Sequence, residues 1–230
     1  VARAGRRVAS AGNIGPTLLD TLAAALAAPD ALPEVWVLEL SSFQLDGVQG
    51  FEPTAATVLN VTQDHLDWHG GMVAYAEAKA RIFGQQALMV LNRDDATVMG
   101  WQPQAQTVQE GRRSRTIAAR AHQTFGTEAP QRAGDWGLES VNGMSWLVRA
   151  LPVDETIRKG RAAEAEAEET HLQRLMPAEA LRIRGRHNAS NALAVLPAHP
   201  LAAWRERDLL RQQGLPWRWL GLALLLGMQS

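Results

Sequence analysis

Residues 35–40 read VWVLEL, and this continuous apolar run of strand length decides the fold. Such a run is typical of a strand that is covered on both faces, as in the parallel sheet of an α/β protein. Two further elements precede it: a β-compatible run at residues 7–11 and the helical stretch LLDTLAAALAA at residues 18–28, with Thr17 as its N-cap. Strand, helix and strand in this order predict a βαβ unit.

The same alternation continues along the chain. We predict strands at residues 55–60 and 87–91, a helix at residues 71–83 between them, and a short helix that Asp94 and Asp95 cap and that ends at Met99. This spacing predicts an α/β fold with a doubly wound, mostly parallel sheet. Because ligands of such sheets bind at the carboxyl ends of the strands, we expect the functional residues at that edge.

Residues 111–185 show a weaker pattern. Short β-like pieces are separated by glycine, proline and charged residues, at 123–125, 136–138, 145–148 and 180–183. They predict a small antiparallel β subdomain. The run RAAEAEAEET at residues 161–170 has high helix propensity but no apolar face, so we interpret it as a solvated face or a flexible insert without a function of its own.

Composition excludes several classes of protein. The chain has 230 residues, of which 46% are hydrophobic and 20% charged, and a formal net charge of -1. These values indicate a soluble globular chain and exclude a general nucleic-acid binder, which needs a basic surface. There is no cysteine, so any metal must be held by oxygen and imidazole ligands. The apolar run at residues 219–228 is much shorter than the roughly 20 residues of a membrane span, so we predict no span. The lack of cysteine and of a signal-peptide pattern in residues 1–10 predicts a cytoplasmic location.

Polar residues follow the first two predicted strands. The sequence GNIG at residues 12–15 is by itself a weak signal, and a tight turn explains it. The stretch ELSSFQ at residues 39–44 places a carboxylate at the end of an apolar strand, which is costly unless the group is paired, hydrated or bound to a cation. Its oxygen-rich side chains suit Mg²⁺. The alternative is a capped strand end whose serines bond to the local backbone.

The loop after the third predicted strand concentrates ionisable groups. Asp64, His65, Asp67 and His69 lie within six residues, a density that indicates a metal site or a proton-transfer role, although ordinary turns also produce such loops. A metal-dependent hydrolase that uses these four residues to activate water is therefore one interpretation. Lys79, on the helix that follows, would by default be a solvated lysine.

A last helix is predicted from GRHNASNALA at residues 185–194, with Asn188 or Ser190 as its cap. Asn191 would then lie one turn inside the helix. Asparagine is a poor residue for a helix interior unless its amide has a partner, so capping leaves Asn191 unexplained.

Five motifs in this order resemble the successive motifs of the ATP-dependent Mur ligases: GNIG (12–15), LELSSFQLD (38–46), LNVTQDHLDWHG (59–70), AYAEAKARIFG (74–84) and GRHNASNALA (185–194). The resemblance covers about residues 7–196 and corresponds to the family's central, P-loop-type ATP-binding domain. GNIG with LELSSFQL resembles the branch that adds D-glutamate, whereas Trp68 with His69 also resembles the branch that adds the third residue.

The resemblance implies an ATP-dependent ligase of peptidoglycan precursor synthesis. It would join D-glutamate to UDP-N-acetylmuramoyl-L-alanine through an acyl phosphate, with ATP and Mg²⁺ as cofactors, as a monomer with small-molecule partners only. Carried over by motif, Glu39 would hold a first Mg²⁺, and His65 and a carboxylated Lys79 a second. The carboxylation would turn an amine into an anionic oxygen ligand.

By the same carry-over, Asn13, Ser41 and Gln44 would contact the UDP-muramoyl substrate, and Asn188 and Asn191 would lie against the adenine of ATP. The family's P-loop is expected before Val1, and neither lysine of the chain fits its Gly-Lys-Thr/Ser ending. We therefore predict a central ATP-binding domain at residues 1–196 without its P-loop and a divergent tail at residues 197–230. Such a chain is expected to be an incomplete ligase that is inactive unaided, or a non-catalytic remnant that still binds nucleotide or substrate.

Overall fold

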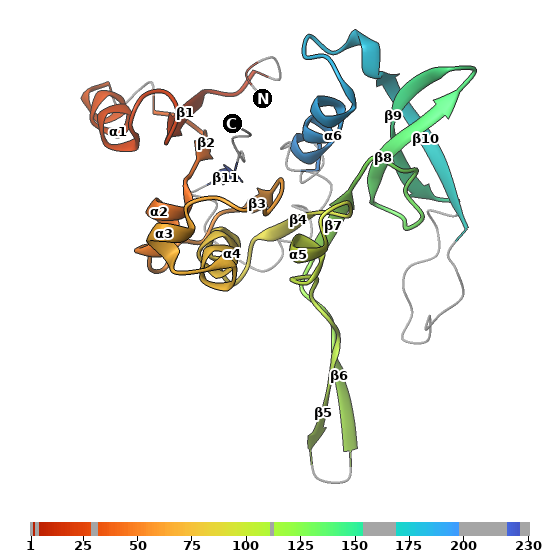
Figure 1. Ribbon diagram of the computed structural model, residues 1–230, viewed down its shortest axis with the longest axis horizontal. Helices are drawn as coiled ribbons and strands as arrows, with labels where there is room; N and C mark the ends of the chain where they lie inside the picture. Colours follow the sequence, from red (N-terminus) through yellow and green to blue (C-terminus); the bar gives the residue numbers. More distant parts are fainter. Residues whose placement is uncertain are drawn as a thin grey trace. The chain divides into compact units, whose positions relative to one another are not determined.

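A computed structural model of the protein describes residues 2, 5–28, 32–110, 113–153, 169–197 and 220–225. The chain divides into two compact units, Val1–His122 with Ala198–Ser230, and Gln123–Pro197. Figure 1 shows the elements of both units. Within the described ranges, no helix has the length and apolar character needed to cross a membrane.

The first unit is built on a parallel sheet. Its strands lie in the order β1 (Val8–Gly12), β2 (Val35–Glu39), β11 (Leu220–Leu225), β3 (Ala55–Val58) and β4 (Leu88–Asn92). All four predicted strands of the alternating region are therefore present, each within two residues of its expected bounds, and the predicted α/β class with a parallel sheet is confirmed. The remaining strand, β11, lies in the divergent tail at residues 197–230, to which the sequence assigned no secondary structure. The other residues of 198–230 lie outside the described part of the chain.

The helices of the first unit follow the predicted positions closely. Helix α1 (Leu18–Ala27) begins after Thr17, whose hydroxyl accepts from the Asp20 amide, and α4 (Met72–Ala80) continues into the 3-10 turn η3 (Arg81–Phe83). Helix α5 (Ala96–Met99) is capped by the Asp95 carboxylate, as predicted. Two short helices were not predicted: α2 (Ser42–Asp46) and α3 (Leu66–His69).

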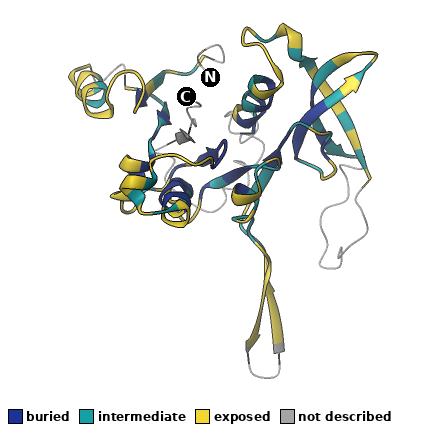
Figure 2. Cartoon of the chain, viewed as in Figure 1, coloured by how far each residue is buried: buried dark blue, intermediate teal, exposed yellow. Residues whose placement is uncertain are grey.

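The core of the first unit lies between the sheet and α2, α4 and η3. Leu45 of α2 and Ile82 of η3 are fully buried against side chains of β3 and β4, such as Val58 and Leu91. Figure 2 shows the resulting dark blue strands β3 and β4. Helix α1 differs, since none of its residues is buried and Leu19 is 77% exposed.

A two-stranded antiparallel hairpin, β5 (Gln106–Glu110) and β6 (Arg113–Ile117), extends from the first unit (Figure 1). Its described side chains are exposed. The hairpin leads to β7 (His122–Phe125), in which the two units divide.

The second unit contains the predicted antiparallel sheet. Its strands lie in the order β10 (Thr170–Pro177), β9 (Met144–Pro152) and β8 (Trp136–Val141), and the unit also holds the 3-10 turn η4 (Ala178–Ala180) and helix α6 (Arg186–Val195). Strands β8 and β9 are joined by Asn142 and Gly143, both of which have positive φ. This is the conformation of the hairpin turn whose twist matches that of the strands.

One predicted strand of this unit is wrong. Residues 180–183 form the end of η4 and a bend, and the third strand is β10, which comes earlier in the chain. The strand ends at Pro177, which has no N–H to donate to a ladder, and the chain then turns into η4. Most of the run at 161–170, which we interpreted as a solvated insert, lies outside the described residues.

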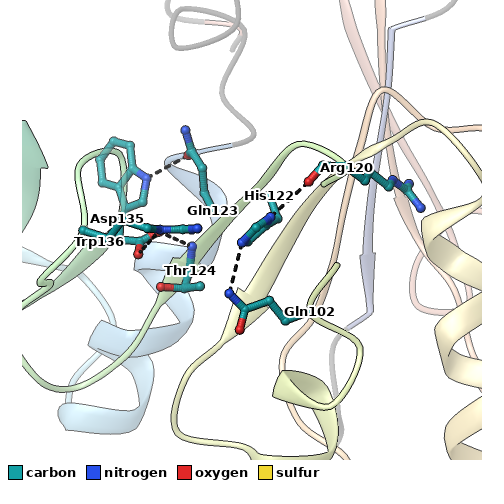
Figure 3. Close-up of polar contacts among 8 residues, drawn as sticks. Gln102, Arg120, His122, Gln123, Thr124, Asp135 and Trp136 are labelled. Atoms are coloured by element: carbon teal, nitrogen blue, oxygen red, sulfur yellow. Dashed lines mark hydrogen bonds and ion pairs between the residues drawn. The ribbon is translucent and has the colours of Figure 1, made fainter. Parts of the chain in front are cut away.

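Polar contacts on each side of the division are drawn in Figure 3. In the first unit the His122 ring lies between the Gln102 amide, 3.1 Å from Nε2, and the Arg120 carbonyl, 3.0 Å from Nδ1. In the second unit the buried Asp135 carboxylate accepts from the Thr124 amide at 2.6 Å and from the Arg132 guanidinium at 3.0 Å. Each contact stabilises the unit to which it belongs.

Candidate functional site

Strands β1 and β2 are parallel neighbours, so the GNIG loop at the end of β1 lies beside Glu39 at the end of β2. The Asn13 amide donates to the Glu39 carbonyl at 2.7 Å. Gly12 has a φ of 143°, and a Cβ at this position would lie 1.8 Å from the Glu39 carbonyl oxygen. Only glycine allows the two strands to approach this closely. The first glycine of GNIG is thus explained by the sheet itself.

The Glu39 carboxylate is also tied to this loop. Its Oε2 accepts from the backbone amide of Ile14 at 2.6 Å. A strand-end carboxylate that is held by a backbone donor keeps a fixed position while its other oxygen is available as a hard ligand. The donor chemistry of Glu39 therefore fits Mg²⁺.

Ser41 and Gln44 form a capping box at the start of α2. The Gln44 amide donates to the Ser41 hydroxyl at 3.3 Å, and the Ser41 amide donates to Gln44 Oε1 at 2.8 Å. The reciprocal bonds satisfy two backbone donors that a helix start leaves open. Of the two interpretations of the ELSSFQ stretch, the structure thus contains the capped strand end. A role of these two side chains toward a substrate stays a prediction.

His65 lies at the start of α3 in a strained conformation. Its φ of 52° is in the left-handed region, which residues with a Cβ adopt infrequently, although histidine does so more often than most; strained backbone of this kind clusters at functional sites. Its Nε2 lies 3.2 Å from Asp64 Oδ2, and its ring centroid is 4.6 Å from that of Phe43 on α2. The loop after β3 and the ELSSFQ stretch, which are far apart in sequence, are therefore in contact.

Lys79 is buried, in contrast to the solvated lysine that is the default for a helix surface. It is 3% exposed, its Nζ donates to the Asn60 carbonyl at 3.0 Å, and the same atom lies 4.7 Å from the centroid of the Tyr75 ring. Burial lowers the pKa of Lys79 from 10.5 to about 8, against the opposing charges of Asp95 and Asp64. A larger share of the amine is consequently neutral near physiological pH than for an exposed lysine.

The loop after β3, whose Asn60 carbonyl accepts from Lys79, also contacts the end of β4 and the turn that follows it. The Asp95 carboxylate, besides capping α5, accepts from the Val61 amide at 2.7 Å, and Asn92 Nδ2 donates to the Leu59 carbonyl at 2.7 Å. The sequence predicts only a capping role for Asp95. The signal for its second role is weak, because a carboxylate that follows a strand has no preferred partner until the sheet order is known.

The structure groups the predicted residues in part. His65 is joined to α2 through Phe43, and Lys79 to the loop after β3 through Asn60. In the described part of the chain, no hydrogen bond or ion pair connects Glu39 with His65 or Lys79, and no three histidine, aspartate or glutamate side chains there form a group that would hold a metal. A shared divalent-cation site stays a prediction.

Asn188 and Asn191 lie on α6, in the second unit. The helix begins at Arg186 after Gly185, so neither Asn188 nor Ser190 is its N-cap, and the expectation of a side-chain cap is wrong. Gly185 has a φ of 98°, a conformation that favours glycine, which places the helix start earlier than the cap residues suggested. Asn188 Nδ2 instead donates back to the Arg184 carbonyl at 2.8 Å. Asn191 is partly exposed on the same helix.

Comparison with known proteins identifies the family to which the chain is similar. The sequence profile of the Mur ligase middle domain matches residues 3–133, more than half of the chain. The chain is 64% identical over 196 residues to a protein of Polaromonas sp. strain JS666 and 62% identical over 196 residues to one of Albidiferax ferrireducens. A protein of Burkholderia pseudomallei strain 668 is 52% identical over 213 residues. All three carry the name UDP-N-acetylmuramoylalanine--D-glutamate ligase.

These alignments cover 85%, 85% and 86% of the chain but only 32%, 37% and 40% of the three relatives. The chain thus spans between about a third and two fifths of the length of the relatives it matches. The matched profile includes the GNIG loop, Glu39, the Asp64–His65 pair and Lys79, so the residues described above lie in the shared region. With this profile over most of its first unit, the chain belongs to the Mur ligase family, through that family's middle domain.

Proposed function

We propose that the chain carries the central part of an ATP-dependent amide-bond ligase of peptidoglycan precursor synthesis, which adds D-glutamate to UDP-N-acetylmuramoyl-L-alanine. The names of the relatives support this substrate pair, as does the combination of GNIG with LELSSFQL. The observation that carries the proposal is the burial of Lys79 beneath the loop of Asp64 and His65. Burying an amine is costly, and a purely structural helix position would be filled better by an apolar side chain.

The proposed reaction has two steps. The carboxylate of UDP-N-acetylmuramoyl-L-alanine takes the γ-phosphoryl group of ATP, which gives an acyl phosphate and ADP. The amino group of D-glutamate then attacks the acyl carbon, forms the amide and releases phosphate. Mg²⁺ supplies neutralisation of the charge on the phosphates during such transfers.

Three residues of the chain would hold Mg²⁺. Glu39 contributes a carboxylate that the Ile14 amide keeps in place. Lys79 and His65 would serve a second ion, with Lys79 as a carbamate. In that modification the neutral amine attacks carbon dioxide, an N–C bond forms and one proton is released. The lowered pKa of Lys79 favours the neutral amine that this reaction requires.

The remaining assignments follow the same proposal. Asn13, Ser41 and Gln44 would contact the UDP-muramoyl substrate, and Asn188 and Asn191 the adenine. The fold would be the doubly wound, P-loop type of the family, which the parallel order of β1, β2, β11, β3 and β4 supports. We further propose a cytoplasmic, monomeric protein, since the substrates are small soluble molecules.

Isothermal titration calorimetry of the 230-residue chain tests the proposal. We expect UDP-N-acetylmuramoyl-L-alanine to bind, and binding to weaken at least tenfold in Asn13→Ala. Because the sequence has no Gly-Lys-Thr/Ser phosphate loop, we expect no ATP-dependent amide formation by this chain alone. In Mg²⁺ titrations we expect Glu39→Gln to weaken binding of the ion, whereas Glu139→Gln, which changes a carboxylate that pairs with Arg174 in the second unit, should leave it unchanged. Absence of substrate binding, or metal-dependent hydrolysis without nucleotide, would count against the ligase and, in the second case, for the hydrolase.

A further inference from the structure

The imidazole of His69, at the end of α3, meets a buried hydroxyl of α2. Its Nε2 lies 3.1 Å from the Ser42 hydroxyl oxygen, and Ser42 is only 3% exposed. A buried hydroxyl that loses its partner is destabilising, so this contact is more than an incidental surface bond. Ser42 is the first residue of α2, directly after the Ser41 cap.

The same ring packs against two aromatic side chains. The rings of His69 and Phe43 are stacked, with centroids 5.7 Å apart and an angle of 19° between the planes. On another side, the His69 and Tyr75 centroids are 5.4 Å apart. Aromatic pairs at these separations are attractive, and they fix the plane of the imidazole.

Tyr75 carries the contact on to Lys79. The Tyr75 ring is buried and lies 4.7 Å from Lys79 Nζ, which in turn donates to the Asn60 carbonyl. A continuous set of contacts therefore runs from Ser42 on α2 through His69 and Tyr75 to the amine. His69 is the member of this set that touches both α2 and α4.

We propose that His69 is a positioning residue of the ligase site: its contacts with Ser42, Phe43 and Tyr75 hold the Ser41–Gln44 turn in register with the Lys79 side chain. That the turn binds the substrate rests on the proposed function. The structural half of the inference, that His69 holds the turn in place, does not depend on it, because the position of the turn is measurable without a ligand.

Hydrogen–deuterium exchange of the ligand-free chain tests that structural half. The reporter is the Leu45 amide, which donates to the Ser41 carbonyl at 3.1 Å. His69→Phe keeps an aromatic ring but removes Nε2, and we expect exchange of this amide to become about five to ten times faster, the effect of losing one side-chain hydrogen bond. His69→Gln, which restores a polar group, should return the rate toward that of the wild type. His171→Phe, the same change at an exposed position of β10, should leave it unchanged.

Substrate affinity forms the second readout. In titrations with UDP-N-acetylmuramoyl-L-alanine we expect His69→Phe to raise the Kd about five- to tenfold, with partial rescue by His69→Gln. The double variant Ser42→Ala/His69→Phe should bind no more weakly than Ser42→Ala, since both changes remove the same bond. Additive losses would overturn the proposed coupling.

The two readouts separate the two proposals. If the wild-type chain does not bind the substrate, the proposed function fails, and the exchange experiment still decides the role of His69. Unchanged Leu45 exchange in His69→Phe overturns the inference. If His69→Phe does not fold, Ser42→Ala replaces it in the exchange experiment, where faster exchange of Leu45 supports the inference and an unchanged rate overturns it.

Discussion

Replacing Lys79 by methionine is expected to stabilise the chain near neutral pH, and the gain should shrink as the pH rises. Methionine has a similar length and flexibility but no charge, so it fills the space of the lysine stem. The wild-type protein must keep a charged amine beneath the loop after β3 whenever Lys79 is protonated. The substitution removes that cost.

The size of the effect follows from the pKa of Lys79, which burial lowers from 10.5 to about 8. The difference, 10.5 - 8, corresponds to about 3 kcal/mol of stability lost while the amine is charged, at about 1.4 kcal/mol for each pH unit. Methionine leaves the Asn60 carbonyl without its donor, which costs about 1 kcal/mol. The free energy of unfolding should therefore rise by about 2 kcal/mol at pH 7.

The sign of the pH dependence follows from the two states. Between about pH 8 and 10.5 the unfolded chain binds a proton at Lys79 that the folded chain has already released, so wild-type stability increases with pH in this range. Lys79→Met has no such titration. The advantage of the variant should fall steadily above about pH 8.

Urea denaturation at about pH 7 and pH 9.5 in buffer free of carbon dioxide measures these values, because carboxylation would replace the titrating amine. Glu77→Met is the matched control, since Glu77 is exposed on the same helix, and we expect a change of at most about 0.5 kcal/mol at both pH values. Equal stability of wild type and Lys79→Met at pH 7, or an advantage that grows with pH, would refute the reasoning.

Three further predictions test the packing. Gly12→Ala should lower the free energy of unfolding by about 3 kcal/mol or more, because its Cβ would lie 1.8 Å from a backbone oxygen, whereas Gly143→Ala, at a φ of 79° with open space around it, should cost about 1 kcal/mol in thermal denaturation. Thr57→Val should raise the melting temperature by an amount equivalent to about 1 kcal/mol, since within the described residues the buried Thr57 hydroxyl has no hydrogen-bond partner; a lower melting temperature would show that it has one. Asp135→Asn should destabilise the second unit by about 2 kcal/mol, measured by urea denaturation, because a backbone amide and an arginine lose a charged acceptor.

The sheet of the first unit could be predicted in large part because strands such as β2, β3 and β4 read as apolar runs, which is typical of parallel strands. A run such as VWVLEL can be recognised as a strand without knowing which strands pair with it. The position of β11 could not be predicted in this way. Its pairing with both β2 and β3 is a contact between segments far apart in the chain, and local sequence does not specify which strands become neighbours.

The site was predictable to the extent that its residues follow strands. Glu39 stands out in sequence because a carboxylate within an apolar run is costly unless it has a partner, and His65 because it lies in a loop that is dense in ionisable residues. The burial of Lys79 was missed although a signal existed. Tyr75, Lys79 and Ile82 are spaced by four and three residues, the period of one helix face, so the lysine shares its face with two buried side chains.

The sheet order also bears on how many cations the proposed site holds. Glu39 ends β2, whereas the loop that binds the Lys79 amine follows β3, and β11 lies between these two strands. Neighbouring strands are about 4.8 Å apart, so β2 and β3 are separated by about 10 Å. A single ion with oxygen ligands at about 2.1 Å could be shared only if the Glu39 side chain and a ligand from the loop after β3 both extended across β11. The two cation positions that we propose, one at Glu39 and one near Lys79 and His65, need no such extension, because each uses a side chain that already lies at the end of its own strand or against the loop after it.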